Sequence, residues 1–196
     1  ILITVISTIG IASAQSIDWQ ELQQNNKQKL EEISEKDQII KIKLNIAIAL
    51  ANQGKIVESH EMFQEIDDIT NKEHFLKTIK PYKEKLEDNP DDLLYLNYAA
   101  FSHIIAEEYK LSIKYLERLT KLDKDNVAII NFLAASHIQI NNLEKAQYYI
   151  KKATQIKESE FSSFLLGYIH YKQGDYFKSL AQFTKSGQLF KHYVMD

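Results

Sequence analysis

The segment FLLGYIHYKQGDYFKSLAQF, residues 164–183, contains two helical patterns separated by one turn. Apolar residues recur at three- and four-residue spacing on both sides of Gly174-Asp175, which gives each pattern one apolar face. Glycine adopts the left-handed backbone of a tight turn without steric cost, so Gly174 marks the place where the chain reverses. The segment therefore predicts two antiparallel helices.

The same order of residue sizes occurs four times in the chain. Each unit has a large residue, replaced by alanine in the second unit, then a small residue, a ring or large apolar group three positions later, a turn residue, a small residue and a large apolar residue. In chain order the units contain Ile46-Ala47, Leu50, Gly54, Ser59 and Phe63; Ala99-Ala100, His103, Glu107, Ser112 and Leu116; Leu133-Ala134, His137, Asn141, Ala146 and Ile150; and Leu166-Gly167, His170, Gly174, Ser179 and Phe183. The last three are offset by 34 and 33 residues, and the first two by 53, one period plus 19. A fixed period indicates a repeat protein.

These columns resemble the tetratricopeptide repeat, a helix-turn-helix unit of about 34 residues. The resemblance covers about residues 38–71 and 93–190. No tryptophan fills the first large place, and Ser59, Ser112 and Ser179 stand where the family usually has alanine. The resemblance implies an all-α fold, a right-handed superhelix (α-solenoid) of antiparallel helix hairpins. It also implies a non-enzymatic module that binds a partner protein or peptide in its concave groove.

Two stretches lie outside the repeat pattern, and together with the repeats they predict the organisation of the chain. Residues 15–37 read as a leading polar helix with Trp19 as its packing anchor, and residues 73–89 as an extra helix that bends the array. The repeat array spans 38–190, with units at about 38–71, 93–126, 127–159 and 160–190 and a C-terminal tail at 191–196. Repeat arrays usually end in a polar capping helix, and none is predicted after the last unit. This suggests either a longer array or a C-terminal face that meets a partner or a second copy.

The first fourteen residues, ILITVISTIGIASA, are apolar or small, carry no charge and end in the small-x-small pattern Ala12-Ser13-Ala14. This pattern predicts a secretory signal peptide cleaved before Gln15, with an uncleaved membrane anchor as the alternative. We therefore expect an exported protein, periplasmic or secreted, that does not contact the membrane after cleavage. A composition rich in lysine, isoleucine and asparagine suggests a bacterial source.

Composition argues against several classes of function. The net charge is −3, and Arg118 is the single arginine, so nucleic acid is not an expected partner. The absence of cysteine excludes disulfides, thiolate metal sites and a cysteine nucleophile. His60-Glu61 begins a zinc-protease pattern, but Gln64 stands where the second histidine belongs. We therefore expect no enzyme activity, no metal site and no cofactor.

Three histidines, His103, His137 and His170, occupy one column of the repeat, and Leu50 holds the same place in the first unit. A ladder of metal ligands would not explain a leucine there, and equivalent residues of stacked repeats lie too far apart to share one zinc ion. We expect the histidines to be ring-shaped packing groups. Because a partly buried imidazole loses stability when it is protonated, they could also loosen the array below about pH 6.

Helical spacing predicts which side chains line the concave face. These are Asn97, Phe101, Ile104, Asn131, Ala135, Ile138, Phe164, Tyr168, Tyr171 and Lys172. Asn97 and Asn131 are 34 residues apart, so their amides could hold the backbone of an extended peptide; the alternative is that they bind water or a neighbouring turn. For the protein as a whole, the leading hypothesis is an exported adaptor or assembly factor. The second is a structural homo-oligomer formed by end-to-end stacking of uncapped repeats.

Overall fold

Residues 16–195 are described by a computed structural model, and they form eleven α-helices followed by one π-helical turn. No strand occurs in this range, so the predicted all-α fold is confirmed. None of the helices within it is long and apolar enough to cross a bilayer. The predicted signal peptide, residues 1–14, lies outside the described residues.

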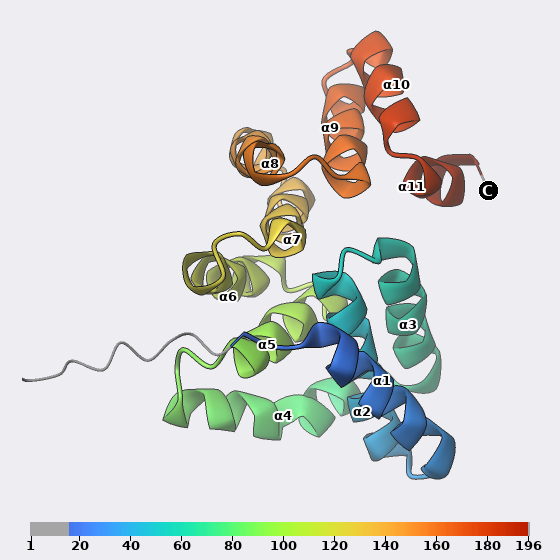
Figure 1. The fold of residues 1–196 in the computed structure, drawn as a ribbon, viewed down its shortest axis with the longest axis vertical. Helices are drawn as coiled ribbons and strands as arrows, with labels where there is room; N and C mark the ends of the chain where they lie inside the picture. The colour runs from blue at the N-terminus through green and yellow to red at the C-terminus, as the bar shows by residue number, and fades with distance from the viewer. Residues whose placement is uncertain (1–15, 196) are drawn as a thin grey trace, which may run out of the picture.

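The helices form antiparallel hairpins that follow one another along the long axis of the molecule (Figure 1). In chain order they are α1 (Trp19–Glu32), α2 (Lys36–Asn52), α3 (Ile56–Ile69), α4 (Lys72–Asp88), α5 (Leu93–Ile105), α6 (Tyr109–Leu122), α7 (Val127–Gln139), α8 (Leu143–Ile156), α9 (Glu160–Lys172), α10 (Tyr176–Lys185), α11 (Gln188–Phe190) and the π-helical turn Lys191–Met195. The pairs α2–α3, α5–α6, α7–α8 and α9–α10 pack against each other. Helices α6 and α8 lie on one side of the molecule, and α3 and α11 on the other.

Each hairpin turns at a residue with left-handed backbone. The φ angles are 76° at Gly54, 57° at Glu107, 58° at Asn141 and 78° at Gly174. In every case the N–H of the next residue donates to the carbonyl of the residue four before the turn residue, for example Glu108 N to His103 O at 2.7 Å and Asn142 N to His137 O at 2.8 Å. These bonds satisfy helix-end carbonyls that would otherwise lack a partner, so the turn column is a structural element of the repeat.

The small column lies where the two helices of a hairpin cross. Ser59 Oγ donates to Ala47 O, and Ser179 Oγ donates to Gly167 O, both at 2.9 Å. A Cβ added at Gly167 would lie 2.6 Å from the ring of Phe183, so even an alanine would force the ring to move. At these two places serine can replace the usual alanine because the facing carbonyl accepts its hydroxyl hydrogen. The hydroxyl of Ser112, in the same column, is buried without a hydrogen-bond partner.

Two of the three column histidines stack on a tyrosine twelve positions later. The ring centroids of His103 and Tyr115 are 5.6 Å apart, and those of His137 and Tyr149 are 5.5 Å apart, with nearly parallel planes. Both imidazoles are almost completely buried. His170 has Gln182 at the corresponding place and is half-buried. Among the described residues, no group of three histidine or acidic side chains could hold a metal ion.

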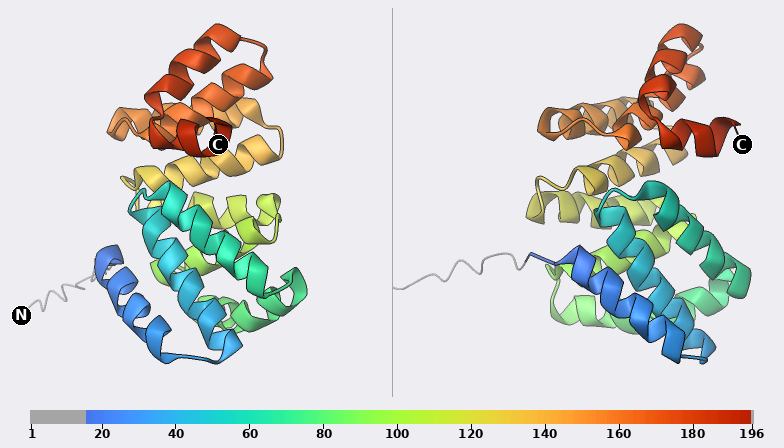
Figure 2. Two further views of the ribbon diagram at one scale, coloured as in Figure 1. Left: turned by 90° about the vertical axis from the view of Figure 1, so that its right-hand side faces the viewer. Right: turned by 45° about the vertical axis from the view of Figure 1, so that its right-hand side comes forward.

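The extra helix α4 changes how the first hairpin joins the array. It begins at Asn71, whose side chain accepts from His74 N, and it packs on α2 and α5. Helix α2 consequently contacts α5 and also reaches α7, two hairpins away. Helix α3 then lies on the concave side (Figure 2). There the ring of Phe63 stacks on that of Phe101, with 5.8 Å between centroids.

Candidate partner-binding groove

The inner face of the array contains a cavity that we call the apolar channel. The first helices α5, α7 and α9 form its floor, α3 forms one wall, and the C-terminal segment Gln188–Met195 forms the other. Its volume is about 630 Å³. Because α3 joins the array at an angle, the hollow is bounded on two sides as well as beneath, which a simple stack of hairpins would not provide.

The apolar channel carries almost no charge. Among the side chains that line it, only His60 and the tyrosines can ionise. Burial lowers the pKa of His60, nearby His192 lowers it further, and Glu61 and Asp67 raise it in part. Burial also raises the pKa of Tyr193 to about 12. At neutral pH the channel therefore presents uncharged rings and aliphatic groups, a surface suited to apolar side chains rather than to ions.

Aromatic rings connect the floor of the channel from one hairpin to the next. The ring of Phe132 meets Phe101 edge-on at 4.9 Å and Phe161 at 5.1 Å. Towards the C-terminus, Phe164 lies 5.6 Å from Tyr193 and 5.5 Å from Phe183. Rings in such edge-on and tilted pairs hold one another in place, so the floor is a rigid surface.

Seven of the ten residues predicted on the concave face lie in or beside the apolar channel. Ile104, Ala135, Ile138, Phe164, Tyr168 and Tyr171 line it. Lys172 lies at its edge, where its Nζ is 5.7 Å from the centroid of the Tyr168 ring. Tyr171 is 56% exposed, so a ring at the mouth of the channel remains available to a partner.

The other three, Asn97, Phe101 and Asn131, are buried, and this corrects the prediction that they face a partner. Helix α3 covers Phe101 through Phe63. Asn97 donates to Leu93 O at 2.8 Å and accepts from Asn52 at 2.9 Å. Because the Asn97 side chain is 2% exposed and already bonded inside the protein, it does not face a bound peptide.

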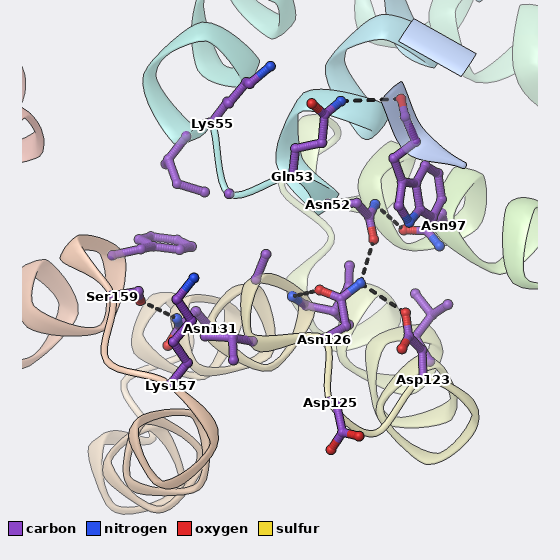
Figure 3. A pocket seen from close by; sticks show the side chains of 18 of the residues that line it. Asn52, Gln53, Lys55, Asn97, Asp123, Asp125, Asn126, Asn131, Lys157 and Ser159 are labelled. Atoms are coloured by element: carbon purple, nitrogen blue, oxygen red, sulfur yellow. Dashed lines mark hydrogen bonds between the residues drawn. The ribbon is translucent and has the colours of Figure 1, made fainter. Parts of the chain in front are cut away.

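The buried asparagines belong to a second cavity, which we call the polar pocket, with a volume of about 900 Å³ (Figure 3). It lies beside the N-terminal ends of α5, α7 and α9 and the turn between α2 and α3. Asn52 donates to Asn97, and Asn126 donates to both Asn52 (2.9 Å) and Asp123 (3.0 Å). This amide chain joins the first, second and third hairpins.

A similar connection joins the third and fourth hairpins. Asn131 Nδ2 donates to Ser162 Oγ at 2.9 Å and lies 3.2 Å from Ser159 Oγ. Ser159 in turn begins α9 by accepting from Ser162 N. Each buried amide therefore ties one first helix to a neighbouring hairpin, which satisfies polar groups inside the array and sets the angle between units.

Several channel residues were not predicted from the sequence. Three of them, Phe132, Phe161 and Leu165, come from the first helices of the hairpins. Their only local signal is that the apolar residues on those helices cover more than one stripe of the surface. The α3 wall includes Ile56, His60 and Phe63. No local pattern indicates that wall, because it depends on the angle that α4 imposes on the first hairpin.

Comparison with known proteins supports the fold. No protein-family model matches the chain, and no curated protein matches its sequence. Solved structures with a similar fold include the one titled "Crystal structure of MamA protein", with TM-score 0.55, 14% identity, and coverage of 89% of this chain and 90% of that one. Another, "MamA 41-end from Desulfovibrio magneticus RS-1", has TM-score 0.51, 17% identity, and coverage of 91% and 98%.

The hairpins, their period and these neighbours together define the class of fold. The chain is an α-solenoid of the tetratricopeptide-repeat type, as MamA is. At such low identity the likeness concerns the fold alone.

Proposed function

We propose that the protein is a non-enzymatic adaptor that binds an apolar segment of a partner protein in the apolar channel. One observation carries this proposal: a channel of about 630 Å³, nearly free of charge, with the half-buried ring of Tyr168 and the exposed ring of Tyr171 at its mouth. Apolar surface of this kind gains free energy when a partner removes it from water, at about 25 cal/mol per Å². Recognition would rest on the partner's side chains, since the buried asparagines are not free to bind its backbone.

The proposal is tested by selecting ten-residue peptides from a random displayed library on the immobilised protein. We expect enriched sequences with at least two large apolar residues. Tyr168→Asp should weaken their binding at least about tenfold in calorimetry, because it places a charge in the channel. Tyr148→Asp is the matched control: Tyr148 is 64% exposed and lines neither cavity. Equal losses in both variants, or no enrichment, would contradict the proposal.

Export remains part of the proposal, on the strength of residues 1–14. An exported adaptor would meet its partner in the periplasm or outside the cell. N-terminal sequencing of the mature protein from that fraction should begin at Gln15. A mature chain that retains residues 1–14 would favour a membrane anchor instead.

A second candidate, self-assembly by stacking of repeats, is favoured by the outer face of α10. Tyr176, Phe177 and Leu180 are 65%, 92% and 59% exposed, an unusual density of large apolar groups on one short helix. A second copy of the chain would be the occupant of this face. Light scattering at tens of micromolar should then give an oligomer that Phe177→Asp dissociates, and a wild-type monomer would exclude it.

A further inference from the structure

The chain's own C-terminal segment, Gln188–Met195, lies in the groove. Leu189 is 4% exposed and contributes to both the apolar channel and the polar pocket. Four residues later on the same helical face, Tyr193 lies 5.6 Å from Phe164 of α9 and 5.3 Å from His60 of α3, measured between ring centroids. The segment thus packs against the α3 wall and the α9 floor of the apolar channel, with a leucine and a tyrosine four positions apart.

A specific turn directs the segment into the groove. Helix α10 ends at Lys185 and is capped by Ser186, whose hydroxyl donates to Phe183 O at 2.7 Å. Gly187 follows with φ 53°, a left-handed angle, and the carboxylate of Glu160 occupies the space where a Cβ would lie. Another residue would be strained at this angle and would have to displace the Glu160 carboxylate, so glycine allows the chain to fold back over the groove here.

Few side chains of the segment are buried against the groove. Leu189 is its only fully buried side chain, whereas Tyr193, Val194 and Met195 are 37%, 52% and 69% exposed. A helix this short has little stability in water by itself, so its order depends on the groove. Because it is tethered by Gly187, its effective concentration at the groove is about millimolar, and even a weak site would be largely occupied.

We propose that Gln188–Met195 is a tethered competitor for the partner site, and that the partner presents an amphipathic helical segment with a large aliphatic and an aromatic residue four positions apart. This inference rests on the proposed function of the channel. The partner's segment displaces the chain's own and takes the places of Leu189 and Tyr193. Since only the undocked fraction can bind, the tether reduces the apparent affinity for the partner in proportion to its own occupancy.

The test uses the full chain and a labelled synthetic peptide of residues 186–195, SGQLFKHYVM, in fluorescence anisotropy. The released variant, Leu189→Asp with Tyr193→Asp, should bind the peptide at least about tenfold more tightly than wild type. The control, Lys191→Asp with Met195→Asp, places two carboxylates at the same spacing on exposed positions, with one more unit of negative charge because it also removes a lysine, and should match wild type. Equal affinity in all three proteins, or no binding to the released variant, overturns the inference.

A second variant covers the case in which the double substitution impairs folding. Gly187→Val leaves every groove contact in place and strains the turn that delivers the segment, so it should also increase peptide affinity, by a smaller factor. Circular dichroism melts check that each variant is folded. Hydrogen exchange of residues 188–195 in wild type should accelerate when a library-selected peptide is added, and unchanged exchange at saturating peptide would overturn displacement.

Failure of the inference and failure of the proposed function give different results. If library peptides bind in a way that depends on Tyr168 but the released variant binds them no better than wild type, the channel binds partners and the segment does not compete. If the released variant binds the 186–195 peptide but the library yields no ligand, the channel serves only the chain's own segment. Only the first of these outcomes leaves the proposed function standing.

Discussion

The polar pocket and the apolar channel lie side by side on the inner face of one array, and they differ in what remains available to a partner. In the polar pocket, Asn52, Asn97 and Asn126 bond to one another. In the apolar channel, rings such as Tyr168 and Tyr171 still face the cavity. The amides of the first region are engaged in bonds between hairpins, whereas part of the apolar surface of the second remains exposed.

This difference changes which repeated residues indicate function. Asn97 and Asn131 recur at one repeat period, and their regular spacing suggested a peptide ladder. The same regularity serves to join neighbouring hairpins. A polar residue that recurs in phase is therefore an ambiguous signal, because the interface between repeats is itself periodic.

The largest expected loss of stability comes from breaking the chain of buried amides in the polar pocket. Asn52→Ala removes the bonds to Asn97, Asn126 and Ile48 O, and should lower the free energy of unfolding by about 3 kcal/mol, since it leaves partner amides without hydrogen bonds inside the array. Urea denaturation measures it. Asn25→Ala, on the exposed face of α1, should change stability by less than about 0.5 kcal/mol. A small effect of Asn52→Ala would mean that water replaces these bonds.

The wall of the channel can be tested next. Phe63→Ala removes the ring that stacks on Phe101 and should lower the free energy of unfolding by about 2 kcal/mol, less than a fully buried phenylalanine because Phe63 is only partly buried. The matched control is Phe177→Ala, at a ring that is 92% exposed, where almost no loss is expected. If both substitutions cost the same, α3 is not held against α5 as the structure has it.

Two adjacent isoleucines separate binding from stability. Ile104 and Ile105 are both partly buried and both pack on the main core, but only Ile104 lines the apolar channel. Ile104→Ala should weaken binding of library-selected peptides about fivefold, whereas Ile105→Ala should leave affinity unchanged at a similar cost in stability. Calorimetric titration distinguishes the two. Equal affinities would place the bound peptide elsewhere.

The smallest expected effect is the change of stability with pH that comes from the buried histidines. Burial lowers the pKa of His137, Lys145 lowers it further, and Glu117 raises it in part. The unfolded chain therefore takes up a proton first as the pH falls: stability from this group is complete above about 6.5 and declines below it. Burial also lowers the pKa of His103, while its hydrogen bond to Glu108 opposes the shift.

Thermal melts at pH 7.5 and 5.5 test whether stability declines as the pH falls. The melting temperature of wild type should be lower at pH 5.5 than at pH 7.5. The decrease should be smaller for His137→Phe, because phenylalanine keeps the ring but cannot ionise. Tyr149→Phe retains the imidazole and its stacking partner and should follow wild type. An identical decrease in wild type and His137→Phe would assign the pH dependence to other groups.

Much of the fold was predictable because it depends on local patterns. The all-α class and the tetratricopeptide type follow from columns that recur with a constant period. The left-handed backbone expected at Gly54, Asn141 and Gly174 is present, and Glu107 adopts it too although its side chain offers no reason for it. The histidine column packs on tyrosine at two of its three places. Spacing along a helix also indicated six residues of the channel, because a helix presents every third or fourth residue to one side.

The walls of the channel could not be predicted in this way. Residues 73–89 were expected to bend the array, but the direction in which α4 turns the first hairpin depends on how its side chains pack between α2 and α5. That direction brings Phe63 onto Phe101 and buries a residue predicted to meet a partner. The C-terminal residues, expected to form a tail, are helical from Lys191 to Met195 and lie against α3 and α9.

The sequence by itself determined the repeat unit, the turns and the apolar faces, since each depends on residues within about one period of one another. The tertiary structure alone decided which polar groups are free and what encloses the channel. Asn52 and Asn126 are 74 residues apart in the chain, and so great a separation leaves no periodic trace in either segment. Whether a repeated residue binds a partner or holds the array together depends on such distant contacts, because they consume its hydrogen bonds and cover its surface.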